Sequence, residues 1–246
     1  MPVEDGCFWL ADLPTQPARP ALTGEQRADV AIVGGGFTGL WTALFLKELA
    51  PEKEVVLLEG ERIAYGASGR NAGQISETFD HSHSLAIQHF GEDEARRLAR
   101  LARQNLDEME AFLVRERIDA EFSRSGQLVL ALTKAHTGDV EVALAAARQL
   151  GIDDWQILDG EATRRRLGSP LPLCALFAPR AATVHPAKLA AGLARVAEGR
   201  GVRILEGSAV VGIEPEGTGL CLSTRSGTLR APRAVLATNA YSHVLA

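Results

Sequence analysis

Runs of apolar and polar positions divide the first sixty residues into a strand, a turn, a helix and a second strand. Residues 29–33 (DVAIV) form a short β-branched run, which is typical of a buried parallel strand. A glycine-rich turn, GGGFTG, follows directly, and the mostly apolar stretch 37–49 predicts a helix that stops before Pro51. A second apolar strand is expected over 55–58, and it leads straight into Glu59.

Residues 92–117 have the pattern of a long amphipathic helix. Leu98, Leu101, Phe112 and Leu113 fall close to one face, and three acids occupy the first turn, where the helix dipole favours negative charge.

The next sixty residues alternate between strand and helix patterns. A strand is expected over 122–132, an alanine-rich helix over 140–150, a short helix capped by Asp159, and a strand over 173–177. This mixture predicts an α+β domain inserted between two passes of the first domain.

The last third of the chain returns to short apolar runs. The chain re-enters the first domain at about Thr183, and Pro186 suits the first turn of a helix over 187–198. Two short strands, RILEG and AVVGI, are expected within 201–213, and another strand, AVLA, follows later. The domains are then expected at 1–26 (an arm), at 27–80 with 183–246 (the discontinuous first domain) and at 81–182 (the inserted domain).

Composition and charge narrow the classes of function. The chain has 246 residues, 46% of them apolar and 23% charged, and a net charge of −5. The negative charge argues against a nucleic-acid partner, because such partners are bound by clustered basic side chains. The basic runs are instead expected on solvated helix faces; they comprise Arg96, Arg97, Arg100, Arg103, Arg164, Arg165 and Arg166.

Cysteine usage and the first residues favour a cytoplasmic protein. Cys7, Cys174 and Cys221 are odd in number and far apart, so they suit neither a disulfide framework nor a zinc site. The N-terminal residues lack the basic start and apolar middle of a secretion signal. Residues 30–46 are uncharged but too short for a membrane span, and they include four glycines.

The glycine-rich turn carries the first chemical signal. Gly34, Gly36 and Gly39 have the GxGxxG spacing, and Glu59 ends the second strand 20 residues beyond Gly39. Gly34 permits a tight turn, Gly36 lets the backbone approach a pyrophosphate, and Gly39 lets helix and strand pack closely. The pyrophosphate would sit at the helix N-terminus, and the acid would accept hydrogen bonds from a ribose diol. The motif alone is weak evidence, but strand, turn, helix, strand and acid occur here in order.

A second glycine-containing loop follows Glu59. A simple nicotinamide-binding domain would continue into another crossover helix and a third strand. Here the chain continues as GERIAYGASGRNAGQIS, with Gly66, Gly69 and Gly73 among polar residues. Such a loop can bring backbone amides against a second part of a long cofactor.

Four segments together resemble a known family. AIVGGGFTGL, LLEGERIAYGASGRNAGQ, TVHPAKLAAGLA and VLATNAY are similar to the FAD-dependent amino-acid and amine oxidases of the D-amino-acid-oxidase-like family, and more narrowly to its gamma-glutamylputrescine-oxidase-like group. The segments span residues 31–241 in the family's order. The resemblance implies FAD as cofactor and an α/β fold: a Rossmann-like, glutathione-reductase-like FAD-binding domain with an inserted, incomplete α+β substrate domain.

The resemblance also implies a set of cofactor-binding positions. Those expected at the pyrophosphate are Gly34, Gly35, Gly36, Phe37, Thr38 and Gly39. Glu59 and Arg62 would lie at the ribose. The residues expected along the ribityl chain and the flavin ring are Ala67, Ser68, Gly69, Asn71, Ala72, Gly73 and Gln74. Val210 would contact the adenine through its backbone, and Thr238 and Asn239 would return to the dinucleotide.

The activity implied is oxidation of a C–N bond in a small amine or amino acid. A hydride passes to flavin N5, the imine hydrolyses, and oxygen reoxidises the flavin; a quinone acceptor, and a D-amino-acid or sarcosine-type substrate, stay open. We predict no particular catalytic side chain. No metal is expected, since His81 and His83 lack a third ligand, and His185 is interpreted as a helix cap or packed side chain.

Family members continue beyond the ATNAY segment, which lies close to the end of this chain. We therefore expect a C-terminally truncated member with weak flavin retention and an association-prone surface. The alternative is a non-catalytic FAD- or nucleotide-binding fragment that needs a complementing chain or an oligomer.

Overall fold

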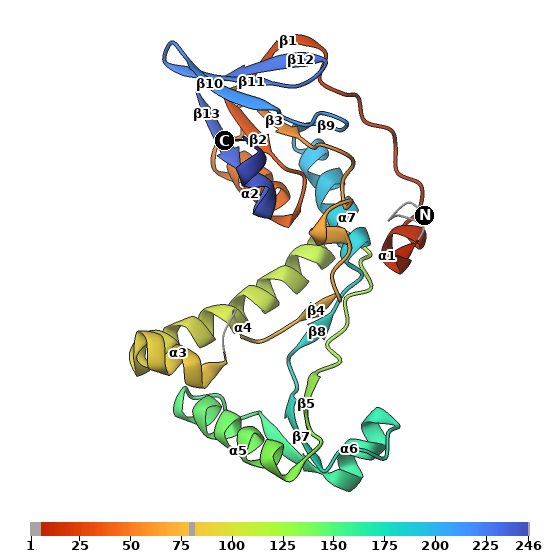
Figure 1. Ribbon diagram of the computed structural model, residues 1–246, viewed down its shortest axis with the longest axis vertical. Coiled ribbons are helices and arrows are strands. Elements are labelled where there is room, and N and C mark those ends of the chain that lie inside the picture. The colour runs from red at the N-terminus through yellow and green to blue at the C-terminus, as the bar shows by residue number, and fades with distance from the viewer. Residues whose placement is uncertain (1–5, 79–81, 246) are drawn as a thin grey trace. The chain divides into compact units, whose positions relative to one another are not determined.

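The computed structural model describes residues 6–78 and 82–245, and its contacts divide the chain into two compact units (Figure 1). Unit 1 comprises Met1–Ala72, Glu116–Ala120 and His185–Ala246, and unit 2 comprises Gly73–Arg115 and Glu121–Val184. His81 lies outside the described residues. No helix among the described residues is long and apolar enough to cross a membrane.

Unit 1 is built on a four-stranded parallel sheet. The strands β2 (Val30–Val33), β3 (Val55–Leu58), β9 (Arg203–Leu205) and β13 (Arg233–Leu236) run in the order β13-β2-β3-β9. Every residue of β2 and β3 is buried, because both faces of the sheet are covered. This explains why these strands appear in the sequence as unbroken apolar runs rather than as alternating ones.

Two helices, α2 (Phe37–Leu49) and α7 (Pro186–Gly199), pack against each other and against this sheet. Pro186 occupies the first turn of α7, as predicted. His185 caps the helix, because its Nδ1 accepts a hydrogen bond from the Lys188 amide at 3.2 Å. The interpretation of His185 as a cap is therefore confirmed.

An antiparallel sheet covers the other face of the parallel one. Its strands β10 (Gly212–Glu216), β11 (Gly219–Ser223) and β12 (Gly227–Ala231) form a meander, and β1 (Gly24–Arg27) adds to β12 in parallel. One apolar cluster joins the two sheets; its buried members include Val33, Val56, Leu58, Leu205, Leu222 and Leu229. The order of antiparallel sheet, parallel sheet and helices confirms the expected α/β fold.

The segment before β1 is fastened along unit 1. Its short helix α1 (Phe8–Ala11) places the Trp9 ring 4.8 Å from the His185 ring. Further along, Arg19 pairs with Glu198 and Glu206, and only 6% of its side chain is exposed.

Unit 2 contains a three-stranded antiparallel sheet, β5 (Gln127–Ala131), β7 (Cys174–Ala178) and β6 (Gln156–Asp159), in the order β5-β7-β6. The helix α5 (Lys134–Gln149) packs against all three strands. Asp159 caps α6 (Gly160–Leu167) by accepting a hydrogen bond from the Ala162 amide, as predicted.

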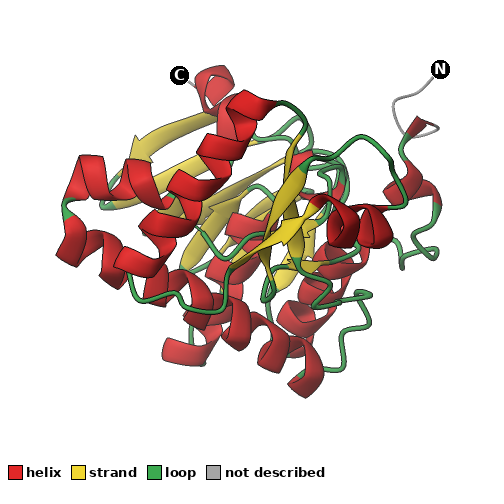
Figure 2. Cartoon of the chain, turned by 90° about the horizontal axis from the view of Figure 1, so that it is seen from below, coloured by secondary structure: helices red, strands yellow, loops and turns green. Residues whose placement is uncertain are grey.

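Two further helices and a two-stranded sheet complete unit 2. The helices are α3 (His83–Phe90) and α4 (Glu92–Arg115), which pack against each other. The strands β4 (Gln74–Ile75) and β8 (Ala182–Thr183) pair antiparallel. Figure 2 distinguishes the helices, strands and loops of the chain by colour.

The buried face of α4 agrees with the predicted one at Phe112 and Leu113 but differs from it elsewhere. Leu101 is 38% exposed, whereas the buried positions are Ala95, Ala99, Ala102, Leu106, Phe112 and Leu113. Small side chains let α3 approach closely, so α4 buries its alanines and Leu101 stays partly exposed. Arg103 also departs from the expected solvated face, because its side chain is only 18% exposed and pairs with the buried Glu77.

Three predicted boundaries also moved. The strand expected over 122–132 is shorter, because Gly126 adopts a positive φ of 74° just before β5. The helix expected from 140 begins at Lys134, where Thr133 caps it through the His136 amide. The strand expected at AVVGI begins only at Gly212.

Candidate functional site

The glycine-rich turn has the close contacts that its spacing predicts. Gly34 has a φ of 110°, and a Cβ there would lie 2.5 Å from the carbonyl oxygen of Ala237. A Cβ on Gly39 would overlap the carbonyl oxygen of Gly34. Both positions therefore require glycine, one for backbone conformation and one for the packing of α2 against the turn.

The first turn of α2 meets the second loop at this point. Gly36 is the N-cap and offers no side chain, and the Phe37 amide donates to Ser68 Oγ at 2.9 Å. A Cβ on Gly36 would lie 2.9 Å from the same oxygen. Among the described residues, no acceptor pairs with the amides of Gly36 and Thr38. These amides, together with the helix dipole, suit an anion.

Glu59 closes the other side of the turn. Its Oε2 accepts a hydrogen bond from the Gly35 amide at 2.7 Å, and its Oε1 accepts one from the Glu61 amide at 3.0 Å. Burial raises the pKa of the Glu59 carboxyl, and the two backbone hydrogen bonds oppose that shift. A partly buried carboxylate at the end of β3 is the group that a ribose diol requires.

The second loop folds into a compact turn, η2 (Ala67–Gly69). Asn71 Nδ2 donates to the carbonyl oxygens of Ala67 and Ser68, at 3.3 and 3.0 Å. A Cβ on Gly69 would overlap the carbonyl oxygen of Ala64, so this glycine is required by packing.

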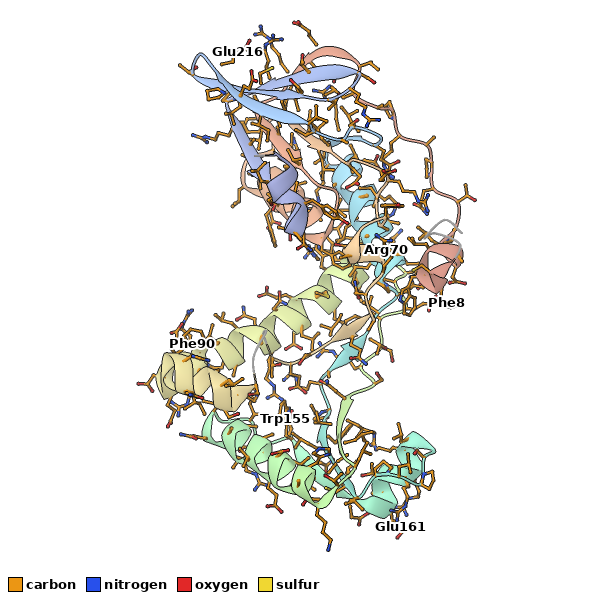
Figure 3. The ribbon with its side chains drawn as sticks, viewed as in Figure 1. Phe8, Arg70, Phe90, Trp155, Glu161 and Glu216 are labelled. Carbon is orange, nitrogen blue, oxygen red and sulfur yellow. The ribbon has the colours of Figure 1, made fainter. Side chains whose placement is uncertain are left out.

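Two arginines flank one aromatic ring beside this loop. The guanidinium carbon of Arg70, labelled in Figure 3, lies 4.9 Å from the centre of the Tyr65 ring, and that of Arg62 lies 5.8 Å from it. Both separations are within the range of cation–π attraction. The three side chains line the same cavity as Glu59.

These parts surround one cavity of about 840 Å³ within unit 1. The predicted cofactor residues that line it are Gly34, Gly35, Gly36, Phe37, Thr38, Glu59, Arg62, Ala67, Ser68, Val210, Thr238 and Asn239. Four separate segments of the chain therefore converge on one space. Val210 is also part of the apolar cluster between the sheets.

The other predicted cofactor residues lie outside that lining: Gly39, Gly69, Asn71, Ala72, Gly73 and Gln74. Gly39 and Gly69 act through packing, and Asn71 bonds back to its own loop. Gly73 and Gln74 belong to unit 2, where Gln74 pairs with Thr183.

Several lining residues were not predicted from sequence. They include Gly60, Glu61, Tyr65, Gly66, Arg70, Ser208, Ala209, Ala237, Tyr241 and Ser242. Tyr65 and Arg70 lie within the glycine-containing loop, so an aromatic residue between two arginines could have drawn attention to them. Ser208 and Ala209 carry no such signal, because only the return of the chain after β9 brings them here.

The donor set fits the ADP half of a dinucleotide. Two amides for which the described part of the chain offers no acceptor meet the cavity at a helix N-terminus, a carboxylate faces it from β3, and side-chain-free glycines keep it open. No group of three or more His, Cys, Asp or Glu that could hold a metal ion occurs among residues 6–78 and 82–245.

Comparison with known proteins agrees with this geometry. Residues 29–246 match the family model described as FAD dependent oxidoreductase, and the chain belongs to that family, whose cofactor is FAD. It is 32% identical over 227 residues to the probable oxidoreductase OrdL of Haemophilus influenzae, covering 92% of this chain and 52% of that protein. It is 33% identical over 220 residues to the gamma-glutamylputrescine oxidoreductase of Escherichia coli, covering 89% and 51%.

Solved structures support the same assignment. The crystal structure of glycine oxidase from Geobacillus kaustophilus superposes with a TM-score of 0.78 at 26% identity, covering 89% of this chain and 57% of that one. The chain thus spans about half the length of the curated relatives it matches.

Proposed function

We propose that this chain forms the FAD-binding part of an oxidoreductase that oxidises the C–N bond of a small amine or amino acid. The observation that carries the proposal is that the glycine-rich turn, Glu59 and the second glycine-containing loop, with Ser68, all line one cavity. The chain also belongs to an FAD-dependent family. The amine and amino-acid chemistry is supported by the relatives named gamma-glutamylputrescine oxidoreductase and glycine oxidase.

The residues take the following roles in this proposal. The amides of Gly36 and Thr38 hold the pyrophosphate, and Glu59 accepts hydrogen bonds from the adenosine ribose. Arg62 supplies positive charge beside the ribose and phosphate. The segment from Ala67 to Gln74 follows the ribityl chain to the flavin ring; its proposed members are Ala67, Ser68, Gly69, Asn71, Ala72, Gly73 and Gln74.

Bound FAD supplies an acceptor for the hydride that leaves the carbon beside the amine nitrogen. The protein's part is to hold the dinucleotide so that its ring has one fixed orientation. The Phe37–Ser68 hydrogen bond serves this purpose, because it locks the loop onto the start of α2. Molecular oxygen is the proposed final electron acceptor, and the cytoplasm is the proposed location.

An absorbance spectrum of the purified protein tests the cofactor assignment. The protein, as isolated or after addition of FAD, is expected to show the two visible bands of a bound flavin. A panel of amines and amino acids under air, with peroxide detection, then tests the chemistry. A colourless protein that FAD does not reconstitute contradicts the assignment.

A second function has its own supporting observation. Because the chain spans about half the length of its relatives, residues 1–246 can act as a nucleotide-binding part that requires a complementing chain for catalysis. In that case the protein binds ADP and FAD but oxidises no amine alone. Restoration of activity on mixing with a separately produced chain corresponding to the other half of a relative would distinguish this from the first function.

A further inference from the structure

The strand that continues from the predicted flavin loop is very short. Gly73 has a φ of 70°, and its carbonyl oxygen accepts a hydrogen bond from the Val184 amide at 2.8 Å. The strand β4 then pairs through only two positions, Gln74 with Thr183 and Ile75 with Ala182. So short a ladder specifies its register weakly, and a slip of one residue would turn Gln74 to the opposite face.

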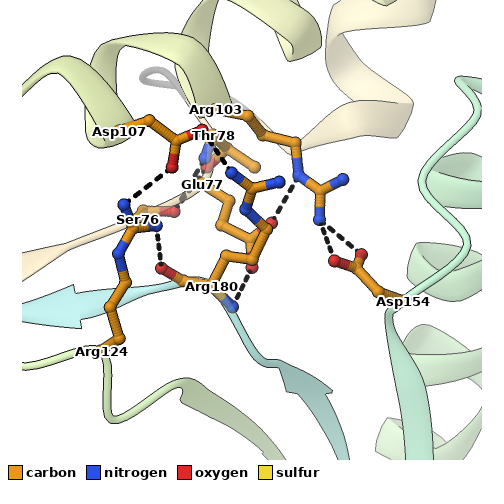
Figure 4. Close-up of polar contacts among 8 residues, drawn as sticks. All are labelled: Ser76, Glu77, Thr78, Arg103, Asp107, Arg124, Asp154 and Arg180. Atoms are coloured by element: carbon orange, nitrogen blue, oxygen red, sulfur yellow. Dashed lines mark hydrogen bonds and ion pairs between the residues drawn. The ribbon is translucent and has the colours of Figure 1, made fainter.

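A buried carboxylate lies two residues beyond β4. The Glu77 side chain has no exposed surface. Its Oε2 accepts a hydrogen bond from Arg103 Nε at 2.9 Å, and its Oε1 accepts one from the Arg180 backbone amide at 2.8 Å (Figure 4). Arg180 lies two residues before β8, so a single carboxylate fastens the end of β4 to the start of its partner strand.

Both partners of Glu77 are themselves held in place. Arg103, on α4, also pairs with Asp154. The carbonyl oxygen of Arg180 accepts a hydrogen bond from Arg124 at 3.1 Å. The backbone of Arg180 is thus fixed through both its amide and its carbonyl group. The Glu77 carboxylate is therefore bonded to groups that are themselves held in place, so it can fix the position of β4.

The chemical nature of this group favours positioning over stability alone. A buried ion pair is weak support for stability, since an apolar pair of similar volume serves as well or better. What an ion pair adds is a defined direction, because each carboxylate oxygen of Glu77 accepts a hydrogen bond from one specific donor. An apolar side chain would fill the same volume without setting the register of β4.

We propose that Glu77 is a positioning residue for Gly73 and Gln74, and that it fixes the end of the flavin-binding loop through Arg103 and the Arg180 amide. This proposal rests on the proposed function, in which Gly73 and Gln74 lie along the flavin ring. It adds a residue that contacts neither cofactor nor substrate.

Amide hydrogen exchange on Glu77→Gln tests the positioning directly, without any cofactor. The Val184 amide bonds to Gly73, so it reports the place of β4. We expect its exchange to become about tenfold faster, as the loss of a charge-assisted hydrogen bond implies, while amides of β7 keep their rates. The matched control Asp154→Asn also removes a carboxylate that contacts Arg103, and it should leave Val184 unchanged.

Equal acceleration at Val184 and in β7, or no acceleration at either, overturns the proposal. If Glu77→Gln does not fold, Glu77→Asp keeps the charge and withdraws it by one methylene group, so a smaller selective effect is expected. If neither variant folds, the proposal is overturned as well, because Glu77 is then required for the folding of the chain rather than for the position of β4.

A flavin measurement then connects positioning to function. With FAD added, Glu77→Gln is expected to change the fluorescence quenching of the flavin while the affinity for ADP stays within about twofold, since ADP contacts only unit 1. Unchanged quenching with selective exchange at Val184 overturns the link to the flavin ring. Absence of FAD binding by the unaltered chain instead counts against the proposed function, and the exchange result still decides the role of Glu77.

Discussion

At the scale of single residues, two glycines of the glycine-rich turn and the second loop have opposite tolerance for a methyl group. A Cβ on Gly39 meets the carbonyl oxygen of Gly34, whereas apart from its chain neighbours no described residue has an atom within 4 Å of a Cβ on Gly66. We expect Gly39→Ala to lower the free energy of unfolding by about 3 kcal/mol or more, because only a backbone shift relieves the overlap. Gly66→Ala is expected to be nearly neutral. Urea denaturation of both variants measures this, and equal stabilities contradict the close packing of α2 on the turn.

Glu59 is the residue on which nucleotide binding should depend most. Replacing Glu59 with Gln removes the negative charge and one of two acceptors, so affinity for ADP should fall about tenfold or more. Glu61 lines the same cavity, and Glu61→Gln removes the same charge without touching the Gly35 contact. Isothermal titration with ADP compares the two variants. Equal losses would mean that general electrostatics, rather than a specific acceptor, explains the effect.

Local rules explain which site residues could be predicted. Gly34, Gly36, Gly39 and Glu59 follow from spacing, because a strand–turn–helix–strand unit places them by its own geometry. Ser208 could not be predicted, since its place in the cavity lining depends on the chain returning after α7 and β9. The first kind of residue is fixed by its neighbours in sequence, and the second by the topology.

At the scale of elements, the N-terminal segment is held by a nearly buried charge. Arg19 donates to Glu198 and Glu206, and Glu198 is about a third exposed. Arg19→Ala is expected to lower the free energy of unfolding by about 2–3 kcal/mol, because it leaves two carboxylates without their partner. Arg230 also pairs with two acids, Glu25 and Glu216, but on the surface, so Arg230→Ala should cost much less. Chemical denaturation of the two variants checks the difference, and equal costs contradict it.

The packing of α3 should make stability depend on pH. His83 is 6% exposed, its ring centre lies 5.0 Å from that of Trp155, and its Nε2 has no hydrogen-bond partner among residues 6–78 and 82–245. Burial lowers the pKa of His83 below its ordinary value of 6.5, with Glu77 opposing and Arg103 adding to the shift. The unfolded chain therefore takes up a proton first as the pH falls. The stabilising contribution is complete above about pH 6.5 and is lost as the pH falls toward the lower pKa of the folded state.

A melting experiment isolates this contribution. We expect the midpoint temperature of the unaltered chain to fall from about pH 7.5 to about pH 5.5, and His83→Phe to remove part of that fall. His89 lies on the same helix but is exposed, so His89→Phe serves as the matched control. An identical pH dependence in all three proteins contradicts the role of His83.

The elements show where sequence patterns were sufficient and where they failed. The position of α2 followed from a mostly apolar stretch that stops before Pro51, and that of α7 from Pro186. The buried face of α4 was predicted only in part, because Phe112 and Leu113 are buried as expected, whereas Leu101 is 38% exposed and alanines are buried instead. The alanines are buried because α3 packs closely against α4. Hydrophobic periodicity alone does not predict which neighbouring helix packs against which face.

At the scale of the whole molecule, apolar side chains remain exposed along α2. Trp41 and Phe45 stack with ring centres 5.8 Å apart, Phe45 is 55% exposed and Leu49 is 84% exposed. These residues are spaced four apart and thus lie on one face of the helix. The sequence predicted an association-prone surface but not its position. A mostly apolar helix has the same residue pattern whether the fold covers one of its sides or both.

Self-association should therefore depend on this face of α2. Phe45→Lys combined with Leu49→Lys is expected to shift the sedimentation profile toward the monomer, because it breaks the apolar stripe and adds like charges. Val142 is 59% exposed and lies on α5. Val142→Lys therefore adds a charge in place of an exposed apolar side chain without touching the stripe, and it should leave the profile unchanged. The exposed face of α2 is not the cause of association if the unaltered chain is monomeric at every concentration. The same conclusion follows if Val142→Lys shifts the sedimentation profile as much as the double substitution on α2 does.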